Sequence, residues 1–261
     1  MLKTIASLWI GKSLGPIELA SIRSFQRHGH EFTLFSYDPI VNCPPDVIQA
    51  DARTVLDLGR IVLHRRTKSP ALHSDLFRYA MVAKTDFTWV DLDVIALRPF
   101  DFPDDNVFGY EAKDSAGSAV LKLPKGSAAL AALSAFSAET RGMPPRLEGF
   151  KRFKYHVKNI LSGGLPIERW PWGSIGPALF TAELKRSEEI AHIRPLNTFY
   201  PVPMSGIPLF ADPGSYSAAD APPEAYAVHL WGSHLTRYVN EKYNGVFPAE
   251  SFVSKVLHDE W

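Results

Sequence analysis

The sequence predicts an α/β fold, and three observations lead to this class. The first 36 residues have the pattern strand, helix, strand, which is typical of α/β domains. An apolar, strand-like run at residues 87–91 follows a helix-like segment in mid-chain, with Asp91 and Asp93 at its end. The chain has 261 residues, of which 46% are hydrophobic and 21% charged, so it can bury a substantial core as one large domain.

The N-terminal part alternates strands and helices. Residues 4–10 form a strand-like run, and Pro16 suits the first turn of a helix whose apolar residues are helically spaced. Phe32, Thr33 and Phe35 favour a second strand, and this opening is typical of a nucleotide-binding half. The expected strands are residues 4–10, 31–36, a short one at 47–48 and 87–91, and the expected helices are residues 16–29 and 70–84.

The C-terminal part is less regular and rich in proline. The chain has 21 prolines, and many of them lie in residues 199–224. We expect that segment to form a lid or binding loop. Residues 143–158 are basic, and turn-rich at their start. The other expected strands are residues 107–111, 118–123 and 226–231, and the other expected helices are residues 126–140, 176–186 and 249–257.

Composition and charge exclude several classes of protein. Lysine plus arginine and aspartate plus glutamate number 28 each, so no net field favours a nucleic acid as partner. Cys43 is the only cysteine, which excludes an internal disulfide and a cysteine zinc cluster. The chain opens on a strand-like run without a signal region, and no window has the roughly 18 apolar residues of a membrane span. We expect a cytoplasmic protein without an obligate protein partner, and peripheral contact with the inner face of the membrane stays open.

Asp91 and Asp93 are the residues on which the functional prediction rests. Side chains two residues apart on a strand point to the same side, so both carboxylates can converge on one divalent cation. Leu92 and Val94 then face apolar packing on the other side. The chain has 15 aspartates, and chance alone supplies roughly one Asp-x-Asp triplet in a chain of this composition. A solvated turn at the end of the strand is therefore the alternative interpretation.

Three segments, taken in order, resemble glycosyltransferases that carry a DXD sugar-binding region. They are Leu8-Trp9-Ile10-Gly11, Ser74-Asp75-Leu76-Phe77-Arg78-Tyr79 and Val90-Asp91-Leu92-Asp93-Val94. Further matches follow at residues 118–121, 176–177 and 228–231, so the resemblance covers nearly the whole chain. It is a resemblance to glycosyltransferase family 32 and to bacterial capsular and lipopolysaccharide glycosyltransferases.

The resemblance implies a GT-A fold, a Rossmann-like single domain over residues 1–261 with a mixed central sheet, flanking helices and proline-rich loops. Residues up to about 125 would bind the nucleotide sugar, and the remainder would form the acceptor-side and closing half. The implied reaction transfers a hexose, with retention at the anomeric carbon, to a glycan or lipid-linked glycan in surface polysaccharide biosynthesis. The donor would be UDP-galactose, UDP-N-acetylgalactosamine or UDP-glucose, with GDP-mannose as the rival, and the cofactor Mn²⁺ or Mg²⁺.

The resemblance also implies roles for individual residues. Asp93 would bind the metal directly, Asp91 would touch the ribose and the metal, and His229 would complete the ligand set. Asp75 and Arg78, three apart on one helical face, would hold sugar hydroxyls and the diphosphate. With Asp93 these two residues make up the implied catalytic set. The implied residue for stacking on the nucleotide base is Trp9.

Each of these residues also has a purely structural interpretation. Asp75 with Arg78 fits a surface helical ion pair, which contributes little to stability. Trp9 fits core packing, because aromatic residues in a first strand usually point inward. His229 fits a buried histidine with satisfied hydrogen bonds on an apolar strand.

Several residues outside this set could assist binding. Lys242, in an expected C-terminal loop, and His234 are candidates to contact the diphosphate. Trp170 and Trp172 flank Pro171 in a loop and fit either stacking on an acceptor sugar or loop packing. A basic cluster fits either a solvated face or docking on an anionic membrane or lipid-linked acceptor. Its members are Lys151, Arg152, Lys154 and Lys158.

Two other classes of function stay open. The segment Phe87–Ile95 also resembles the apolar strand and Asp-x-Asp nucleophile of haloacid dehalogenase phosphatases, although Ile95 stands where that motif has Thr or Val. That motif also normally lies near the N-terminus. The second class is a module that binds a nucleotide sugar without turnover, and the complete set of candidate site residues speaks against it.

Overall fold

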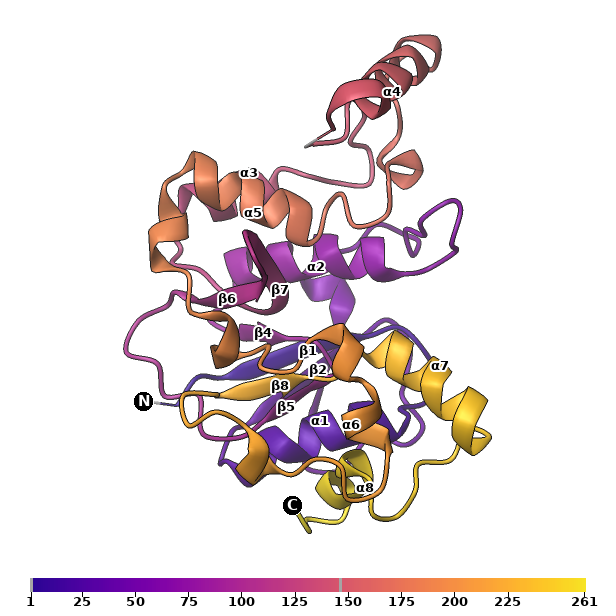
Figure 1. Ribbon diagram of the computed structural model, residues 1–261. Helices are drawn as coiled ribbons and strands as arrows, with labels where there is room; N and C mark the ends of the chain where they lie inside the picture. Colours follow the sequence, from indigo (N-terminus) through magenta and orange to yellow (C-terminus); the bar gives the residue numbers. More distant parts are fainter. Residues whose placement is uncertain (1, 146) are drawn as a thin grey trace.

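A mixed six-stranded sheet forms the centre of the computed structural model, which describes residues 2–145 and 147–261 (Figure 1). Its strand order is β3-β2-β1-β4-β7-β6, in which β1 to β4 run parallel and β7 and β6 join antiparallel. β5 and β8 form a separate antiparallel pair. The strands are β1 (Ile5–Trp9), β2 (Phe32–Ser36), β3 (Ile48–Asp51), β4 (Thr88–Val90), β5 (Val94–Ala96), β6 (Val107–Ala112), β7 (Ser115–Lys122) and β8 (Ala227–His229).

Helices cover both faces of the sheet, which confirms the predicted α/β class. α2, α3 and α5 pack together over β4 and β7, and α1 packs with α8 and β5 on the opposite side (Figure 1). Among the described residues, no helix combines the length and apolar character needed to cross a membrane. The helices are α1 (Pro16–Arg27), α2 (Ala71–Lys84), α3 (Ala128–Ser134), α4 (Gly149–Leu161), α5 (Pro177–Arg186), α6 (Pro208–Ala211), α7 (Gly232–Tyr243) and α8 (Phe252–Leu257).

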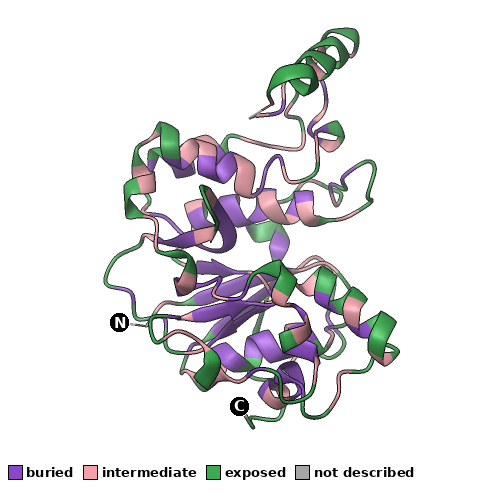
Figure 2. Cartoon of the chain, viewed as in Figure 1, coloured by how far each residue is buried: buried purple, intermediate pink, exposed green. Residues whose placement is uncertain are grey.

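The first strands and helix follow directly from their sequence. β1 and β2 are buried along almost their whole length, as expected for parallel strands with helices on both faces (Figure 2). α1 begins at Pro16, and the Gly15 N–H donates to the Glu18 carboxylate at 2.8 Å, which satisfies one free donor of the first turn. Ile17 and Phe25 then bury the inner face of this helix.

The chain leaves the main sheet immediately after β4. Three residues form a turn, and the following strand β5 pairs with β8 from the far end of the chain (Figure 1). The register of this pair places Val94 opposite His229. A residue from the C-terminal part is therefore fixed beside the end of β4.

Two long helices, α4 and α7, and the short α6 lie where no helix was expected, and α3 and α8 are shorter than expected. α4 occupies the basic segment, whose apolar residues recur every three to four positions. α7 covers the region that was expected to be a C-terminal loop. α3 ends at Ser134, because Ser137 and Thr140 bond each other in a turn, in which the Ser137 N–H donates to Thr140 Oγ1 at 2.8 Å.

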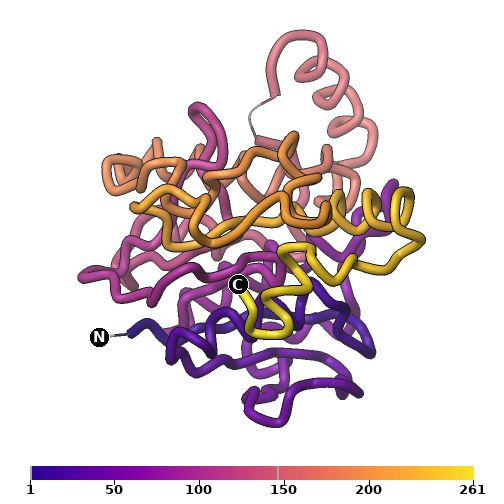
Figure 3. Tube along the Cα trace, turned by 60° about the horizontal axis from the view of Figure 1, so that its bottom comes forward, coloured from indigo at the N-terminus to yellow at the C-terminus, as the bar shows by residue number. Residues whose placement is uncertain are grey.

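The proline-rich segment 199–224 is well packed. Tyr200, Phe210 and Tyr216 are buried in it, and its helix α6 contacts both α7 and α8. Figure 3 shows this orange segment beside the yellow C-terminal helices. The segment therefore contributes core residues to the C-terminal half instead of lying loosely over it.

Candidate functional site

The Asp91-Leu92-Asp93 triplet forms a turn, not a strand end as the sequence analysis expected. β4 stops at Val90, the Asp91 N–H donates to the Ala119 carbonyl at 2.7 Å, and the Val94 N–H donates to the Asp91 carbonyl at 3.2 Å. The carboxylates still lie near each other, but the cause is this turn and not strand alternation. Leu92 and Val94 are buried in the core, as expected.

Asp91, Asp93 and His229 form a group that could hold a metal ion. One ligand atom from each lies within 4.8 Å of the others, and His229 Nε2 lies 3.2 Å from Asp93 Oδ1. Ligands at about 2.1 Å from Mg²⁺ or a cation of similar size are at most about 4.2 Å apart. A contraction of about 0.6 Å, from 4.8 to 4.2 Å, would bring the widest pair within reach of one ion. Within the described part of the chain, the buried His229 Nδ1 has no hydrogen-bond partner, while Nε2 is the ring nitrogen that faces Asp93.

Helix α7 fixes the second carboxylate. Gly232, its first residue, donates its N–H to Asp93 Oδ2 at 2.7 Å, and the positive end of the helix favours a negative charge there. A Cβ at Gly232 would lie 3.0 Å from the Cβ and Oδ2 of Asp93, so any other residue would require Asp93 to shift by a few tenths of an ångström. Trp231, just before it, adopts the left-handed region at φ 55°. The loop is therefore shaped around Asp93.

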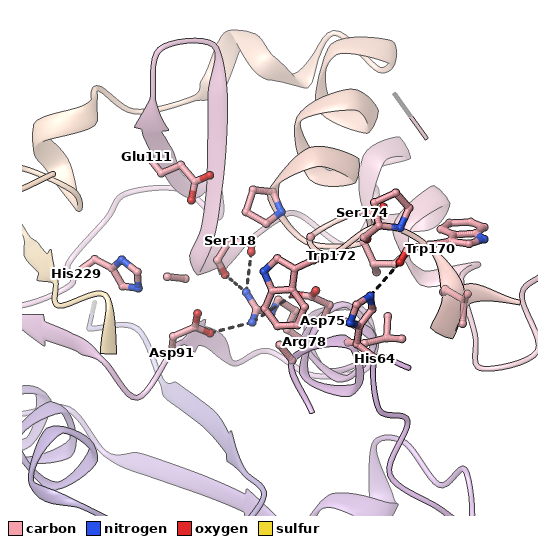
Figure 4. Close-up of a pocket in the computed structure, with 18 residues that line it drawn as sticks. His64, Asp75, Arg78, Asp91, Glu111, Ser118, Trp170, Trp172, Ser174 and His229 are labelled. Atoms are coloured by element: carbon pink, nitrogen blue, oxygen red, sulfur yellow. Dashed lines mark hydrogen bonds and ion pairs between the residues drawn. The ribbon is translucent and has the colours of Figure 1, made fainter. Parts of the chain in front are cut away.

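Arg78 contacts the Asp91 carboxylate and lies in the wall of a cavity beside it (Figure 4). Its Nη2 lies 3.1 Å from Asp91 Oδ1 and 3.5 Å from Asp75 Oδ1, and its Nη1 donates to the carbonyl and the Oγ of Ser118, both at 2.7 Å. The guanidinium lies over the Trp89 ring, whose Nε1 donates to Asp91 at 2.7 Å. Arg78 is 6% exposed, so the interpretation as a surface ion pair is wrong.

Burial and neighbouring charges shift the pKa of every ionisable group here. Burial raises the pKa of Asp75 to about 6, against the attraction of Arg78, and burial likewise raises the pKa of Asp91. Burial alone would raise the pKa of Asp93. The attraction of His229 and the hydrogen bonds that Asp93 accepts from His229 and Gly232 outweigh burial, so the pKa of Asp93 is lowered. The same pairing with Asp93 raises the pKa of His229 against the effect of burial. Asp93 and His229 therefore each favour the charged form of the other.

A cavity of about 210 Å³ opens beside these residues. Asp75, Arg78, Asp91 and His229 line one side of it, and Glu111 extends into it from β6 (Figure 4). The sequence analysis missed Glu111, because a single carboxylate in a hairpin strand carries no motif. The rest of the lining is Ser118, Ala119, Ala71, Leu72, His64, Ile167, Trp170, Pro171, Trp172, Gly173, Ser174, Ile175 and Pro177.

The two tryptophans at the opposite end of the cavity differ in role. Trp170 is buried, and its Nε1 donates to the Leu165 carbonyl at 3.1 Å, so it packs the loop. Trp172 is 55% exposed and makes an edge contact with His64, at 5.5 Å between ring centroids. His64 Nε2 is in turn 3.0 Å from the Trp170 carbonyl oxygen. Of the pair, Trp172 is the one free to contact a ligand.

Asp93 does not line this cavity although it contacts His229, and three other predicted binding residues do not line it either. Trp9 lies at the carboxyl end of β1, beside β4, and its Nε1 donates to the Ser13 carbonyl at 3.1 Å. Lys242 lies on α7, not in a loop, and its ammonium is held by Asp212 at 2.8 Å. His234 is exposed in the first turn of α7. Their roles toward a donor stay predictions.

The assembled site offers a cation-binding group, a buried arginine and two further carboxylates around one small cavity. Such a combination suits a ligand that carries both negative charge and hydroxyl groups. It lies at the edge where parallel strands β1 and β4 end, the usual ligand position in open α/β sheets. No protein-family model matches the chain, and no curated protein matches it either.

Proposed function

We propose that this protein is a metal-dependent retaining glycosyltransferase with a GT-A fold. It would transfer a hexose from a nucleotide sugar to a glycan or glycolipid acceptor in surface polysaccharide biosynthesis. The observation that carries the proposal is the meeting of Asp91, Asp93 and His229 beside a cavity walled by Arg78 and Asp75. The resemblance of the segments around Trp9, Asp75 and Asp91 to DXD glycosyltransferases supports it.

A nucleoside diphosphate leaves readily only when its developing charge is neutralised. A bound Mn²⁺ or Mg²⁺ would act as a Lewis acid on the diphosphate, held by Asp91, Asp93 and His229. The residues of the chain hold that ligand set in place: Arg78 fixes Asp91, and the Gly232 N–H fixes Asp93. Both terminal nitrogens of Arg78 already have protein partners, so we assign it this positioning role together with added positive charge at the cavity wall.

The remaining carboxylates would face the sugar. Asp75 and Glu111 line the cavity from opposite elements, α2 and β6, and carboxylates accept hydrogen bonds from sugar hydroxyls. Burial raises the pKa of Glu111, and Ser115 Oγ donates to it at 3.2 Å. We propose a front-face displacement, in which the leaving phosphate takes the proton of the acceptor hydroxyl.

A panel of nucleotide sugars tests this proposal. The purified protein should hydrolyse or transfer from one UDP-hexose, or from GDP-mannose, in the presence of Mn²⁺ and lose that activity with a chelator. Asp86→Asn serves as a matched control for changes at Asp93, because Asp86 is an exposed aspartate near the same strand.

Three other results would contradict the proposal. Absence of turnover and of any thermal shift with every nucleotide sugar would remove a donor site altogether. A thermal shift without turnover, even with acceptor glycans, would favour the non-catalytic binding module. Hydrolysis of simple phosphate esters would favour the haloacid dehalogenase class.

A further inference from the structure

Helix α4 stands apart from the rest of the molecule. Figure 1 shows it projecting beyond α2 and α5, and Figure 2 shows its surface largely exposed. All 13 of its residues are described, and none of them is buried. Tyr155 is its side chain that packs against the main core. The helix is therefore attached through a narrow contact, and most of its surface faces outward.

One exposed face of α4 is apolar. At 100° per residue, its five large apolar side chains fall within an arc of about 100°, the width of a face that normally packs on a core. They are Phe150, Phe153, Val157, Ile160 and Leu161. Leu161 is 82% exposed and Phe150 79%, and the rings of Phe150 and Phe153 lie 6.5 Å apart. An apolar face of this size on a soluble protein indicates a partner.

One flank of this face is basic. The sequence of α4 contains Lys151, Arg152, Lys154 and Lys158 and no aspartate or glutamate. On a helical projection Lys154, Lys158 and Lys151 follow directly after the apolar arc on one side, whereas His156 borders its other side and Arg152 lies beyond it. Lysine and arginine stems can lie along apolar surface while their charges reach a polar layer. The arrangement is that of a helix that lies in the plane of a membrane interface.

The groove beside α4 carries the same charge. It has a volume of about 930 Å³, and Glu168, its one acidic residue among those described, is paired with Arg60 at 2.6 Å. Trp172 lines both this groove and the cavity of the candidate site. The basic residues that line the groove are Arg65, Arg66, Lys151, Lys154, Lys158 and Arg169.

We propose that α4 docks this protein on an anionic lipid bilayer. The face from Phe150 to Leu161 inserts among the acyl chains, and the basic flank and groove bind headgroup phosphates. Charge favours an anionic occupant: lysines border the apolar face on one side, α4 contains no aspartate or glutamate, and the adjoining groove is lined by six basic residues. Docking would place the mouth of the cavity, marked by Trp172, at the bilayer surface.

Vesicle flotation with the full chain tests the proposal. The protein should float with phosphatidylcholine vesicles that contain phosphatidylglycerol and stay unbound with phosphatidylcholine alone. Binding should weaken strongly near 1 M salt, where the Debye length falls to about 3 Å. Phe150→Ser with Ile160→Ser, and separately Lys154→Glu with Lys158→Glu, should each reduce partitioning by about tenfold or more.

Matched substitutions away from α4 serve as controls. Val41→Ser with Val246→Ser removes two other exposed apolar groups, and Lys12→Glu with Lys185→Glu reverses two other exposed charges. Both control pairs should keep wild-type partitioning, and circular dichroism should show that every variant is folded.

The proposal is overturned if the wild type ignores anionic vesicles, if it binds neutral vesicles equally well, or if the α4 variants bind like their controls. It is also overturned if the apolar α4 variant abolishes a dimer in sedimentation while vesicles bind nothing, because a second copy then covers the face. Donor hydrolysis without vesicles is measured separately, so failure of docking and failure of the glycosyltransferase proposal remain distinguishable.

Discussion

The candidate site buries charged side chains, whereas helix α4 exposes large apolar ones. Around the site, Asp75, Arg78 and His229 are withdrawn from solvent, although burial of charge costs desolvation energy. On α4, Phe150 and Leu161 face solvent, although burial would stabilise the fold. Neither region is explained by folding alone. We propose a partner outside the chain for each, a polar ligand for the first and an apolar surface for the second.

The two regions also differ in how firmly they are held. The site carboxylates are fixed by the Arg78 network and by the close approach of Gly232, so small changes there should be costly. α4 makes few contacts with the core, so changes on its outer face should leave the fold intact. Substitutions in the two regions therefore separate ligand chemistry from stability.

Asp93→Asn should have the largest effect. The variant keeps an oxygen for the Gly232 N–H but loses the charge that pairs with His229 and would bind the cation. We expect Mn²⁺-dependent donor turnover to fall by at least about a hundredfold, with a melting temperature within a few degrees of wild type. Initial rates across a Mn²⁺ titration measure this, with Asp86→Asn as the control. Full activity in the variant would remove Asp93 from the metal site.

Arg78→Lys should come next. A single ammonium cannot contact Ser118 and Asp91 with the geometry of the guanidinium, and it lies less well on Trp89. We expect a loss of about 2 kcal/mol in unfolding free energy and a clear fall in kcat/KM. Arg186→Lys is the control, because Arg186 pairs with Glu183 at the same spacing but is exposed. Equal, small effects of both changes would mean that the buried ion pair of Arg78 contributes no more to stability than the exposed ion pair of Arg186.

Gly232→Ala probes the close approach to Asp93. The added Cβ would press on Asp93 at 3.0 Å and displace its carboxylate, while alanine itself suits a helix. Turnover should fall about tenfold with little change in stability, since a misplacement of about 1 Å can cost about a hundredfold and this one is smaller. Gly126→Ala adds a Cβ that meets nothing within 4 Å and should be silent. Wild-type turnover in Gly232→Ala would show that Asp93 can move freely.

Asp75→Asn should stabilise the protein while it impairs turnover. Burial raises the pKa of Asp75 from 3.8 to about 6, so the folded state binds this proton more tightly than the unfolded state. The unfolding free energy therefore falls as pH rises through this window and stays reduced above it. Asparagine removes this cost, and we expect a gain of up to about 3 kcal/mol at neutral pH that vanishes below pH 3.8. Denaturant unfolding at several pH values measures it, and a variant less stable at neutral pH contradicts it.

The sequence predicted the parts of the fold that rest on local pattern. β1, α1 and β2 follow from apolar periodicity and Pro16, and α2 carries Asp75 and Arg78 as expected. The grouping of Asp91 with Asp93 was predicted for the wrong reason, because a turn and not a strand holds them. Their juxtaposition with His229 depends on the pairing of β5 with β8, a long-range contact that no local pattern encodes.

The predictions that failed also have causes that can be named in the structure. Glu111 enters the cavity only because the β6–β7 hairpin folds back over α2. Lys242 lies on α7, in a region that was expected to be a loop, and its ammonium contacts Asp212. The helical spacing of α4 was present in the sequence, but its lysines and arginine dominated the interpretation of the segment. A solvated basic segment and an amphipathic helix share their charges and differ only in the order of the apolar residues between them.

Two alanine substitutions compare how much a ring on α4 and a ring in the core contribute to the unfolding free energy. The smaller effect is expected on α4. Phe153→Ala removes a ring that is 63% exposed, so the unfolding free energy should change by less than about 0.5 kcal/mol. Phe77→Ala removes a fully buried ring and should cost about 3 to 5 kcal/mol. Urea unfolding followed by circular dichroism measures both. A cost above about 1 kcal/mol at Phe153 would mean that this face is packed within the free protein, and the reason to assign it an external partner would then be lost.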